Sequence, residues 1–153
     1  EGISQYFVAV DDDRQKYATL KDIFGFISLS QCIIYCNSVK RVQDLYEAMK
    51  EDDFPVCRIH SSMDKVEREK SFKEFRMGGS RVLISSNVTA RGIDVQQVSI
   101  VINFDIPESP ENYIHRIGRT GRAESPGEAI SFISADDEHH FKVIQKKMSK
   151  TLN

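Results

Sequence analysis

The sequence has few cysteines and no long apolar run, and each shortage excludes a class of protein. Its three cysteines are an odd number, which argues against a disulfide scaffold and fits a reducing compartment. No apolar stretch approaches the roughly 18 residues that a membrane-spanning helix needs. The N-terminus has neither the positive charge nor the apolar stretch of a signal peptide. We therefore expect a protein with no membrane segment, in the cytoplasm or the nucleus.

A phosphate-binding loop and a metal site are missing as well. No Gly-x-x-x-x-Gly-Lys-[Ser/Thr] segment occurs, although a self-sufficient nucleotide hydrolase of the α/β class uses this loop to hold phosphates. If residues 31–36 form a strand, the sulfurs of Cys32 and Cys36 lie roughly 13 Å apart, too far to share one ion. We interpret them as buried free thiols, and His139 and His140 as solvated residues on a helix. No metal site is predicted.

Composition is that of one ordinary domain. The chain has 153 residues, 40% of them apolar, so it can bury a core without disulfides or metals. The 21 Lys and Arg nearly balance the 23 Asp and Glu, which leaves a net charge of −2. Any contact with nucleic acid must therefore come from a local patch. Because repeats, low-complexity segments and internal linkers are absent from the sequence, a single domain is expected over 1–153.

Short apolar runs alternate with longer amphipathic stretches, which indicates an α/β fold. Several of the apolar runs lack polar alternation, as expected of parallel strands covered by helices on both faces. Strands are predicted at 5–10, 32–35, 56–59, 82–84, 100–103 and 128–133. Helices are predicted at 14–24, 39–50, 65–77, 110–117 and 137–147. In the helix at 39–50, four side chains repeat at helical spacing and should face the sheet: Val42, Leu45, Tyr46 and Met49.

Helix starts and strand ends locate a candidate ligand site. Ser38 and Asp64 are good N-caps, and Pro110 suits the first turn of a helix. Polar residues occur where three predicted strands end, in the segments 35–38, 84–87 and 103–105. Because ligands of an open parallel sheet bind at the carboxyl ends of the strands, we expect the site at this edge.

The segment 115–122 carries the most specific signal for function. Its sequence, His-Arg-Ile-Gly-Arg-Thr-Gly-Arg, places three arginines and two glycines beside a histidine. A guanidinium stays charged and matches phosphate oxygens with a planar fork, so these arginines are predicted to hold phosphate. The helix should end at Gly118 and Gly121, which leaves Arg119 and Arg122 on a turn. The alternative is a solvated basic turn.

The segment resembles the last conserved motif of the DEAD-box RNA helicases. Upstream, Ala-Arg-Gly-Ile-Asp at 90–94 resembles the preceding motif of that family, in the correct order and at the usual distance. The residues between them, 95–107, are most similar to the translation initiation factor 4A branch. The resemblance runs from Gly2 to about Ser134. It implies a RecA-like, doubly wound, mostly parallel sheet, and it identifies the chain as the C-terminal one of the family's two RecA-like domains.

The resemblance also implies half of an active site. The Asp-Glu-Ala-Asp signature is absent from this sequence, and in the family it lies with the phosphate loop on the N-terminal ATP-binding domain, which we expect to be missing here. That domain would hold most of ATP and its magnesium. The resemblance gives Arg119 and Arg122 the role of catalytic arginine fingers at the γ-phosphate. It adds Gly92 and Asp94 to the nucleotide site, with Asp94 at the ribose.

Further roles follow from the same resemblance. His115 and Arg91 would couple the two domains, although His115 has the alternative of a satisfied interfacial histidine. Taken without the motif, Arg68 is as readily a solvated surface charge. RNA contacts are implied at positions that meet phosphates and sugars, without reading sequence: Asn37, Ser38, Arg68, Ser86 and Gly92.

We therefore expect the C-terminal half of an ATP-dependent RNA helicase that unwinds or remodels RNA in translation initiation. Expected partners are single-stranded or duplex RNA, ATP, the protein's own N-terminal domain and a scaffold protein of the translation initiation factor 4G type, with the helicase itself a monomer. The isolated domain should be inactive. The alternatives are a helicase of another branch (splicing, ribosome assembly or messenger turnover), a stand-alone mononucleotide-binding module, and a catalytically silent RecA-like interaction domain.

Four residues, in three places, depart from the initiation-factor pattern. Ser61 and Ser62 stand where relatives usually carry glycine and an acid, Lys65 replaces a glutamine, and Asn87 replaces an aspartate. Because two acids are lost and a lysine is gained, we hypothesise tighter and more salt-dependent RNA binding. An unchanged salt slope in a Lys65→Gln variant would contradict this hypothesis.

Overall fold

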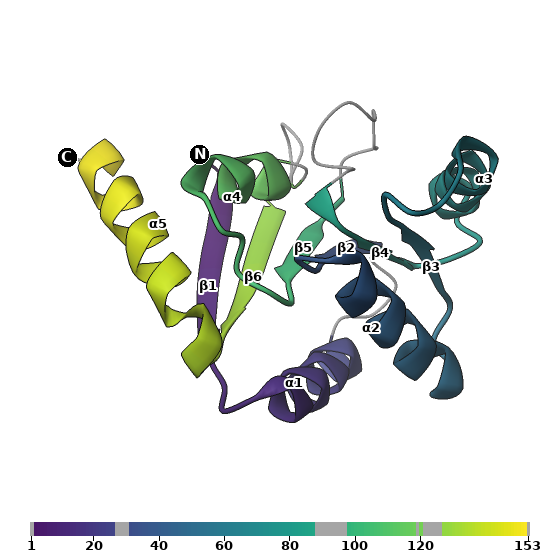
Figure 1. Ribbon diagram of the computed structural model, residues 1–153, viewed down its shortest axis with the longest axis horizontal. Helices are drawn as coiled ribbons and strands as arrows, with labels where there is room; N and C mark the ends of the chain where they lie inside the picture. The colour runs from purple at the N-terminus through teal and green to yellow at the C-terminus, as the bar shows by residue number, and fades with distance from the viewer. Residues whose placement is uncertain (1, 27–30, 88–97, 119, 121–126, 153) are drawn as a thin grey trace.

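The computed structural model describes residues 2–26, 31–87, 98–118, 120 and 127–152. Within these residues six parallel strands form one sheet in the order β1-β6-β5-β2-β4-β3 (Figure 1). The strands are β1 (Ile3–Ala9), β2 (Cys32–Tyr35), β3 (Val56–Ile59), β4 (Val82–Ser85), β5 (Ile100–Asn103) and β6 (Gly127–Ile133). The helices are α1 (Asp13–Phe26), α2 (Val39–Glu51), α3 (Lys65–Arg76), α4 (Pro110–Ile117) and α5 (Glu138–Leu152), with a short 3-10 helix η2 (Ala135–Asp137) before α5.

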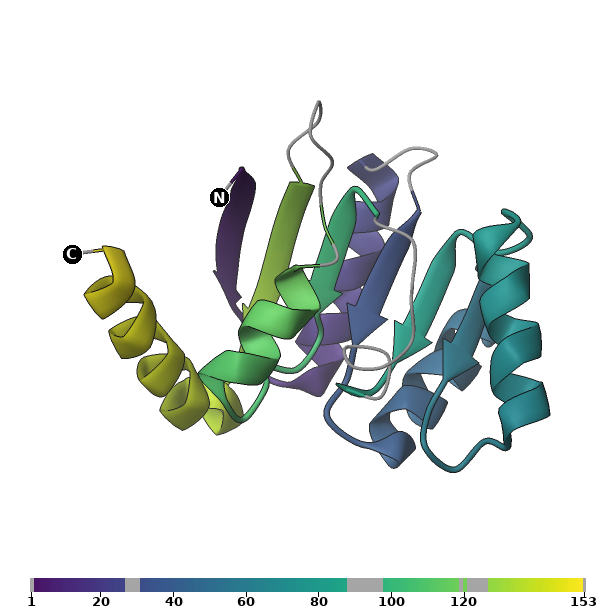
Figure 2. The ribbon, with the colours of Figure 1, turned by 90° about the horizontal axis from the view of Figure 1, so that it is seen from above.

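Helices cover the sheet on both faces, so the predicted doubly wound α/β fold is confirmed. α1 and α2 lie on one face, and α3, α4 and α5 on the other (Figures 1 and 2). On the first face, Leu20 of α1 and Met49 of α2 pack against strand residues such as Ile34. On the second face, Phe75 of α3 packs against Ile33, while α4 and α5 share a separate cluster over β6. The central strands are thus buried on both sides.

Predicted boundaries agree closely with the structure. β2, β3, β5 and α4 match the predicted ranges residue for residue. α5 continues to Leu152, beyond the predicted end at 147, and no glycine or proline follows Lys147 to stop it. The prediction for α2 is also confirmed, because Val42, Leu45 and Met49 are buried and Tyr46 packs against the same cluster.

The helix caps follow the predicted chemistry. The Ser38 hydroxyl accepts from the backbone N–H of Arg41 at 3.2 Å and caps α2. Asp64 forms a capping box with Glu67 at the start of α3. Ser109 caps α4, with Pro110 in its first turn. α4 ends at Gly118 as predicted, but Gly118 keeps a right-handed φ of −63°, so the end does not depend on a left-handed glycine.

The cysteines and His139 lie as predicted, whereas His140 is only partly exposed. All three cysteines are free and buried, and burial raises the pKa of Cys32 and of Cys57 to about 12. His139 is exposed on α5 and His140 is half-buried beside it. Within the described parts of the chain, no three potential metal ligands are grouped to hold an ion, and no helix is long and apolar enough to cross a membrane.

Candidate functional site at the carboxyl edge of the sheet

Because all described strands are parallel, their carboxyl ends meet at one edge. Asn37 follows β2 after one residue, Ser86 follows β4 directly, and Asp105 lies two residues after β5. β2 pairs with both β4 and β5, so these loops are neighbours. The sequence prediction that the polar strand ends gather at one edge is confirmed.

Asp105 is the centre of this edge. Its carboxylate is buried and accepts hydrogen bonds from three residues of the two helices and loops around it. Lys16 Nζ donates to Oδ1 at 3.0 Å, Arg41 donates through Nε and Nη2 at 2.7 Å each, and the backbone N–H of Asn37 donates to Oδ2 at 3.0 Å. Burial pushes the pKa of Asp105 upward, but the hydrogen bonds from Arg41 and the charge of Lys16 outweigh it, so the pKa is lowered. Asp105 is therefore ionised in the folded protein at neutral pH.

The two cations also pair with carboxylates after β6 and at the start of α1. Lys16, whose side chain is only 2% exposed, also pairs with Asp137 Oδ2 at 2.9 Å. Asp137 Oδ2 accepts from the backbone N–H and the hydroxyl of Ser134, which follows β6. On the other side Arg41 forms a two-pronged pair with Asp13 at 2.8 and 2.9 Å. We call this set, Asp13, Lys16, Arg41, Asp105, Ser134 and Asp137, the Asp105 network.

The Asp105 network ties helices of one face to strand ends across the sheet. α1 contributes Asp13 and Lys16, α2 contributes Arg41, and the segments after β5 and β6 contribute the remaining members. Lys16 Nζ also lies 5.6 Å from the centre of the Phe104 ring. Such buried pairs are costly to break singly, since one unpaired charge then stays buried. The network therefore holds the carboxyl edge in one arrangement.

Arg116 is the second buried cation of this edge, and its side chain is fully buried. Its Nε donates to Asn87 Oδ1 at 2.8 Å and its Nη2 to Asn37 Oδ1 at 2.7 Å. Its Nη1 donates to Asn103 Oδ1 at 3.1 Å and to the Asp105 carbonyl at 2.8 Å. Its guanidinium lies over the Tyr35 ring, 5.1 Å from the ring centre. Burial lowers the pKa of Arg116 to about 10, which still leaves it protonated at neutral pH.

The expectation that all three arginines of 115–122 hold phosphate is wrong for Arg116. Its donors point into the domain and are used by the ends of β2, β4 and β5. The cause is its position on α4, because Tyr113, Arg116 and Ile117 form the buried face of that helix. This spacing of three and four residues was visible in the sequence and would have placed Arg116 inside.

The predicted RNA-contacting residues differ in whether their side chains are already bonded or buried within the domain. Asn37 is held within the domain, since its Nδ2 donates to the Ile106 carbonyl at 2.8 Å and its Oδ1 accepts from Arg116. Ser38 is exposed, whereas Ser86 is buried at the adjacent strand end. Arg68 is half-buried on α3, which packs against β3 at the side of the sheet beyond β4. The structure thus brings Asn37, Ser38 and Ser86 together, with Arg68 on the neighbouring helix.

The remaining predicted positions lie at or beyond the described residues. His115 is exposed on α4. Arg91, Gly92, Asp94, Arg119 and Arg122 lie outside the described residues, so their roles stay predictions. Thr120, between the two predicted fingers, is described. It forms a parallel bridge with Val98, and its hydroxyl donates to the Ile117 carbonyl at 2.7 Å.

Of the departures from the family pattern, Asn87 has a defined contact. Ser61, Ser62 and Lys65 are exposed at the end of β3 and the start of α3. Asn87 is half-buried and accepts the Arg116 hydrogen bond described above. The hypothesis of more salt-dependent RNA binding stays untested.

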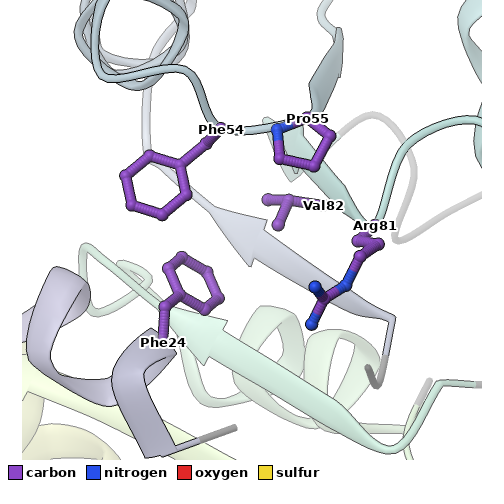
Figure 3. A pocket seen from close by; sticks show the side chains of 5 residues that line it. All are labelled: Phe24, Phe54, Pro55, Arg81 and Val82. Atoms are coloured by element: carbon purple, nitrogen blue, oxygen red, sulfur yellow. The ribbon is translucent and has the colours of Figure 1, made fainter. Parts of the chain in front are cut away.

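A pocket lies at the opposite, amino-terminal edge of the sheet. Figure 3 shows the rings of Phe24 and Phe54 with Pro55, Val82 and the Arg81 guanidinium lining it. Val82 is the first residue of β4, and Pro55 directly precedes β3. None of the residues predicted for nucleotide or RNA contact lines this pocket.

Comparison with known proteins identifies the domain. Residues 15–124 match the family model described as "Helicase conserved C-terminal domain". The ATP-dependent RNA helicase FAL1 of Candida glabrata is 50% identical over 146 residues, which is 95% of this chain and 37% of that protein. The ATP-dependent RNA helicase eIF4A of Kluyveromyces lactis is 50% identical over 137 residues, 90% of this chain and 35% of that protein. The chain thus spans little more than a third of these relatives.

Solved structures agree with the sequence matches. The C-terminal domain of the DEAD-box protein Dbp5 has a TM-score of 0.87 and 35% identity, covering 97% of this chain and 87% of that one. Saccharomyces cerevisiae Dbp5 bound to RNA and ADP BeF3 has a TM-score of 0.86 and 36% identity, covering 95% of this chain and 39% of that one. The family model, the identities and the shared RecA-like fold together show that the chain belongs to the helicase conserved C-terminal domain family, as the C-terminal domain of a DEAD-box RNA helicase of the eIF4A branch.

Proposed function

We propose that this chain is the C-terminal half of an ATP-dependent RNA helicase, which closes with an N-terminal RecA-like domain on ATP and single-stranded RNA to unwind or remodel RNA. The observation that carries the proposal is the carboxyl edge. There the ends of β2 and β4, with Asn37, Ser38 and Ser86, lie beside α4, which leads into Arg119 and Arg122. A protein of the same fold binds RNA and ADP BeF3, which supports this assignment.

The chemistry assigned to this chain is charge stabilisation. Arg119 and Arg122 meet the γ-phosphate from across the cleft and stabilise charge that develops during hydrolysis. Arginine fingers of GTPases contribute about 10³ to 10⁵ in rate, which sets the scale. Asp94 and Gly92 bind the nucleotide, and His115 and Arg91 couple the domains. The family resemblance assigns the magnesium that neutralises phosphate charge to the N-terminal domain.

RNA binding is assigned to Asn37, Ser38, Arg68, Ser86 and Gly92, independent of base sequence. The Asn37 side chain and its backbone N–H are both hydrogen-bonded within the domain, so the exposed Ser38 is the more accessible of these two positions. We place the protein in the cytoplasm or the nucleus, as a monomer.

Translation initiation is the pathway that we favour, with a scaffold of the translation initiation factor 4G type as partner. The eIF4A name of one relative supports it, whereas relatives named FAL1 match equally well and keep other helicase branches open. A catalytically silent interaction domain is the second candidate.

The test is RNA-stimulated ATP hydrolysis by three proteins: this chain alone, the full-length protein that contains it, and the full-length Arg122→Ala variant. We expect no turnover by the chain alone, turnover by the full-length protein, and loss of turnover in the variant with its fold intact. Turnover by the chain alone would refute the half-site assignment. An inactive full-length protein would favour the interaction domain.

A further inference from the structure

α5 is the most basic of the helices that the structure describes. Its four lysines against one glutamate give it a formal charge of +3 in a chain whose net charge is −2, so the remainder of the chain carries −5. Charge asymmetry of this kind within one domain indicates contact with an anionic partner, and clustered lysines are typical of nucleic-acid-binding surfaces.

The apolar side of α5 is already used within the domain. Ile144 is buried, and Phe141 and Met148 pack against the same cluster over β6. The Phe141 ring also lies 5.0 Å from the Phe7 ring of β1, centre to centre. A helix that binds a lipid surface or a protein groove does so with its apolar side. Because that side of α5 faces the domain, the side left for a partner is the polar one.

The polar side of α5 presents Lys142 and Lys146 to solvent. They are four residues apart, and His139 precedes Lys142 by three, so the three exposed side chains lie on one line along the helix. In the described part of the chain neither lysine has a carboxylate within ion-pair distance, although Glu138 lies one turn before Lys142. Both ammonium groups are therefore available to a phosphate.

This line of side chains is separate from the assigned RNA contacts. α5 lies at the β1 end of the sheet in both views (Figures 1 and 2), and it begins directly after Asp137 at the carboxyl edge. β6 and β5 separate β1 from β2, which makes about 14 Å across three strand spacings. A single strand bound at Ser38 and Ser86 therefore lies at the ends of β2 and β4, away from α5.

We propose that the polar side of α5 is a second RNA-binding site, which holds the phosphate backbone of an RNA duplex flanking the single strand through Lys142 and Lys146, with His139 beside them. Double-stranded RNA is recognised largely by its shape and its phosphates. Sites for single strands add aromatic rings on which bases stack, whereas Phe141 of α5 packs against the domain. The site rests on the proposed function, because it presumes that RNA is the substrate.

The test measures RNA binding by the full-length protein over a range of salt concentrations. The probes are a blunt RNA duplex of about 16 base pairs, the span that a double-stranded-RNA-binding domain contacts, and one of its strands alone. One variant, Lys142→Gln with Lys146→Gln, removes both charges, and a second, Lys142→Arg with Lys146→Arg, keeps them. The matched control, Lys50→Gln with Lys73→Gln, removes two exposed lysines from α2 and α3. Thermal unfolding of each variant checks its fold.

We expect the α5 glutamine pair to make duplex binding less salt-dependent, with the slope of log affinity against log salt lower by about two, since each phosphate contact contributes about one. Between about 50 and 200 mM salt this variant should lose about tenfold less affinity than the wild type. The arginine pair and the control pair should match the wild type, and binding of the single strand should change less than binding of the duplex.

An unchanged slope in the α5 glutamine pair would refute the site, as would an equal change in the control pair or an equal change for the single strand. Loss of duplex binding in a folded arginine pair would also contradict it, because the charges are then still present. A wild-type protein whose ATP hydrolysis is not stimulated by single-stranded RNA would instead refute the proposed function.

Discussion

At the scale of single residues, the carboxylate of Asp105 links the residues that form the carboxyl edge of the sheet. It accepts from Lys16, Arg41 and the backbone of Asn37, and its neighbour Asp13 accepts from the same Arg41 guanidinium. A hydrogen bond from Arg41 lowers the pKa of Asp13, and the pKa of Asp105 is lowered despite burial. Both carboxylates thus bind protons less readily in the folded protein than in the unfolded chain.

This difference predicts acid sensitivity. Because both folded-state pKa values lie below the ordinary value of 3.8, the unfolded chain binds more protons, and stability falls as the pH drops below about 4. Above that range the contribution is fully present. Urea unfolding at pH values from neutral to acidic should show this loss.

Asp105→Asn is the matching variant. At neutral pH it should lower the free energy of unfolding, but by less than the roughly 3 to 5 kcal/mol of an unpaired buried charge, because Lys16 keeps Asp137 and Arg41 keeps Asp13 as partners. Its remaining acid dependence should be shallower than that of the wild type. Asp44→Asn, which removes an exposed i,i+4 partner of Lys40, is the control and should change little. Parallel pH profiles of wild type and Asp105→Asn would contradict the assignment.

The charged members of this edge were the hardest to predict from the sequence. Lys16 follows a run of charged residues that indicates a solvated face, although Leu20, four residues later, is on the same buried side of α1. The partners of Lys16 lie after β5 and β6, so only the folded sheet brings the charges together. Local spacing can reveal that such a residue is buried, but not which charge it meets.

At the scale of elements, α4 is short, and a cap and a proline mark its start. Ser109 accepts from the backbone N–H of Asn112 at 3.2 Å, and Pro110 occupies the first turn. Strands and helices were predictable because their signals are local: all four residues of β2 are apolar and buried, and caps mark α2, α3 and α4. The end of α5 was not predictable, since no breaker marks it.

Ser109→Ala should lower the free energy of unfolding by about 1 kcal/mol, because a backbone N–H at the start of α4 loses its acceptor. Ser109→Asp, which keeps an acceptor, should retain most of the stability. Chemical denaturation of the isolated domain measures both. An alanine variant as stable as the wild type would show that the cap is dispensable.

At the scale of the whole molecule, the reactivity of the three thiols can be used to detect opening of the sheet. Cys32, Cys36 and Cys57 are all buried, in β2, directly after it and in β3. Burial holds their pKa values well above the ordinary range, so few thiolates form in the folded protein. The α/β fold and the thiols could be predicted from periodicity and cysteine count, whereas residue roles in 88–97 and 121–126 depend on the family resemblance.

Alkylation by iodoacetamide at pH 8 should therefore be slow for all three cysteines and should accelerate together as urea unfolds the domain. Mass spectrometry of the digested protein would measure each site. Rapid labelling of one cysteine in the native protein would show local opening at that strand and contradict a uniformly closed sheet.

The pairing of β1 with β6 sets an order of folding. Ile3 lies beside Gly127 and Ala9 beside Ile133, so β1, the first strand in this sheet along the sequence, pairs with β6, the last. Until β6 has been synthesised, β1 has no strand partner in this sheet. Such long-range parallel contacts form slowly, and a nascent chain in this state is open to pairing with other strands. The sheet is thus complete only when its last strand has been synthesised.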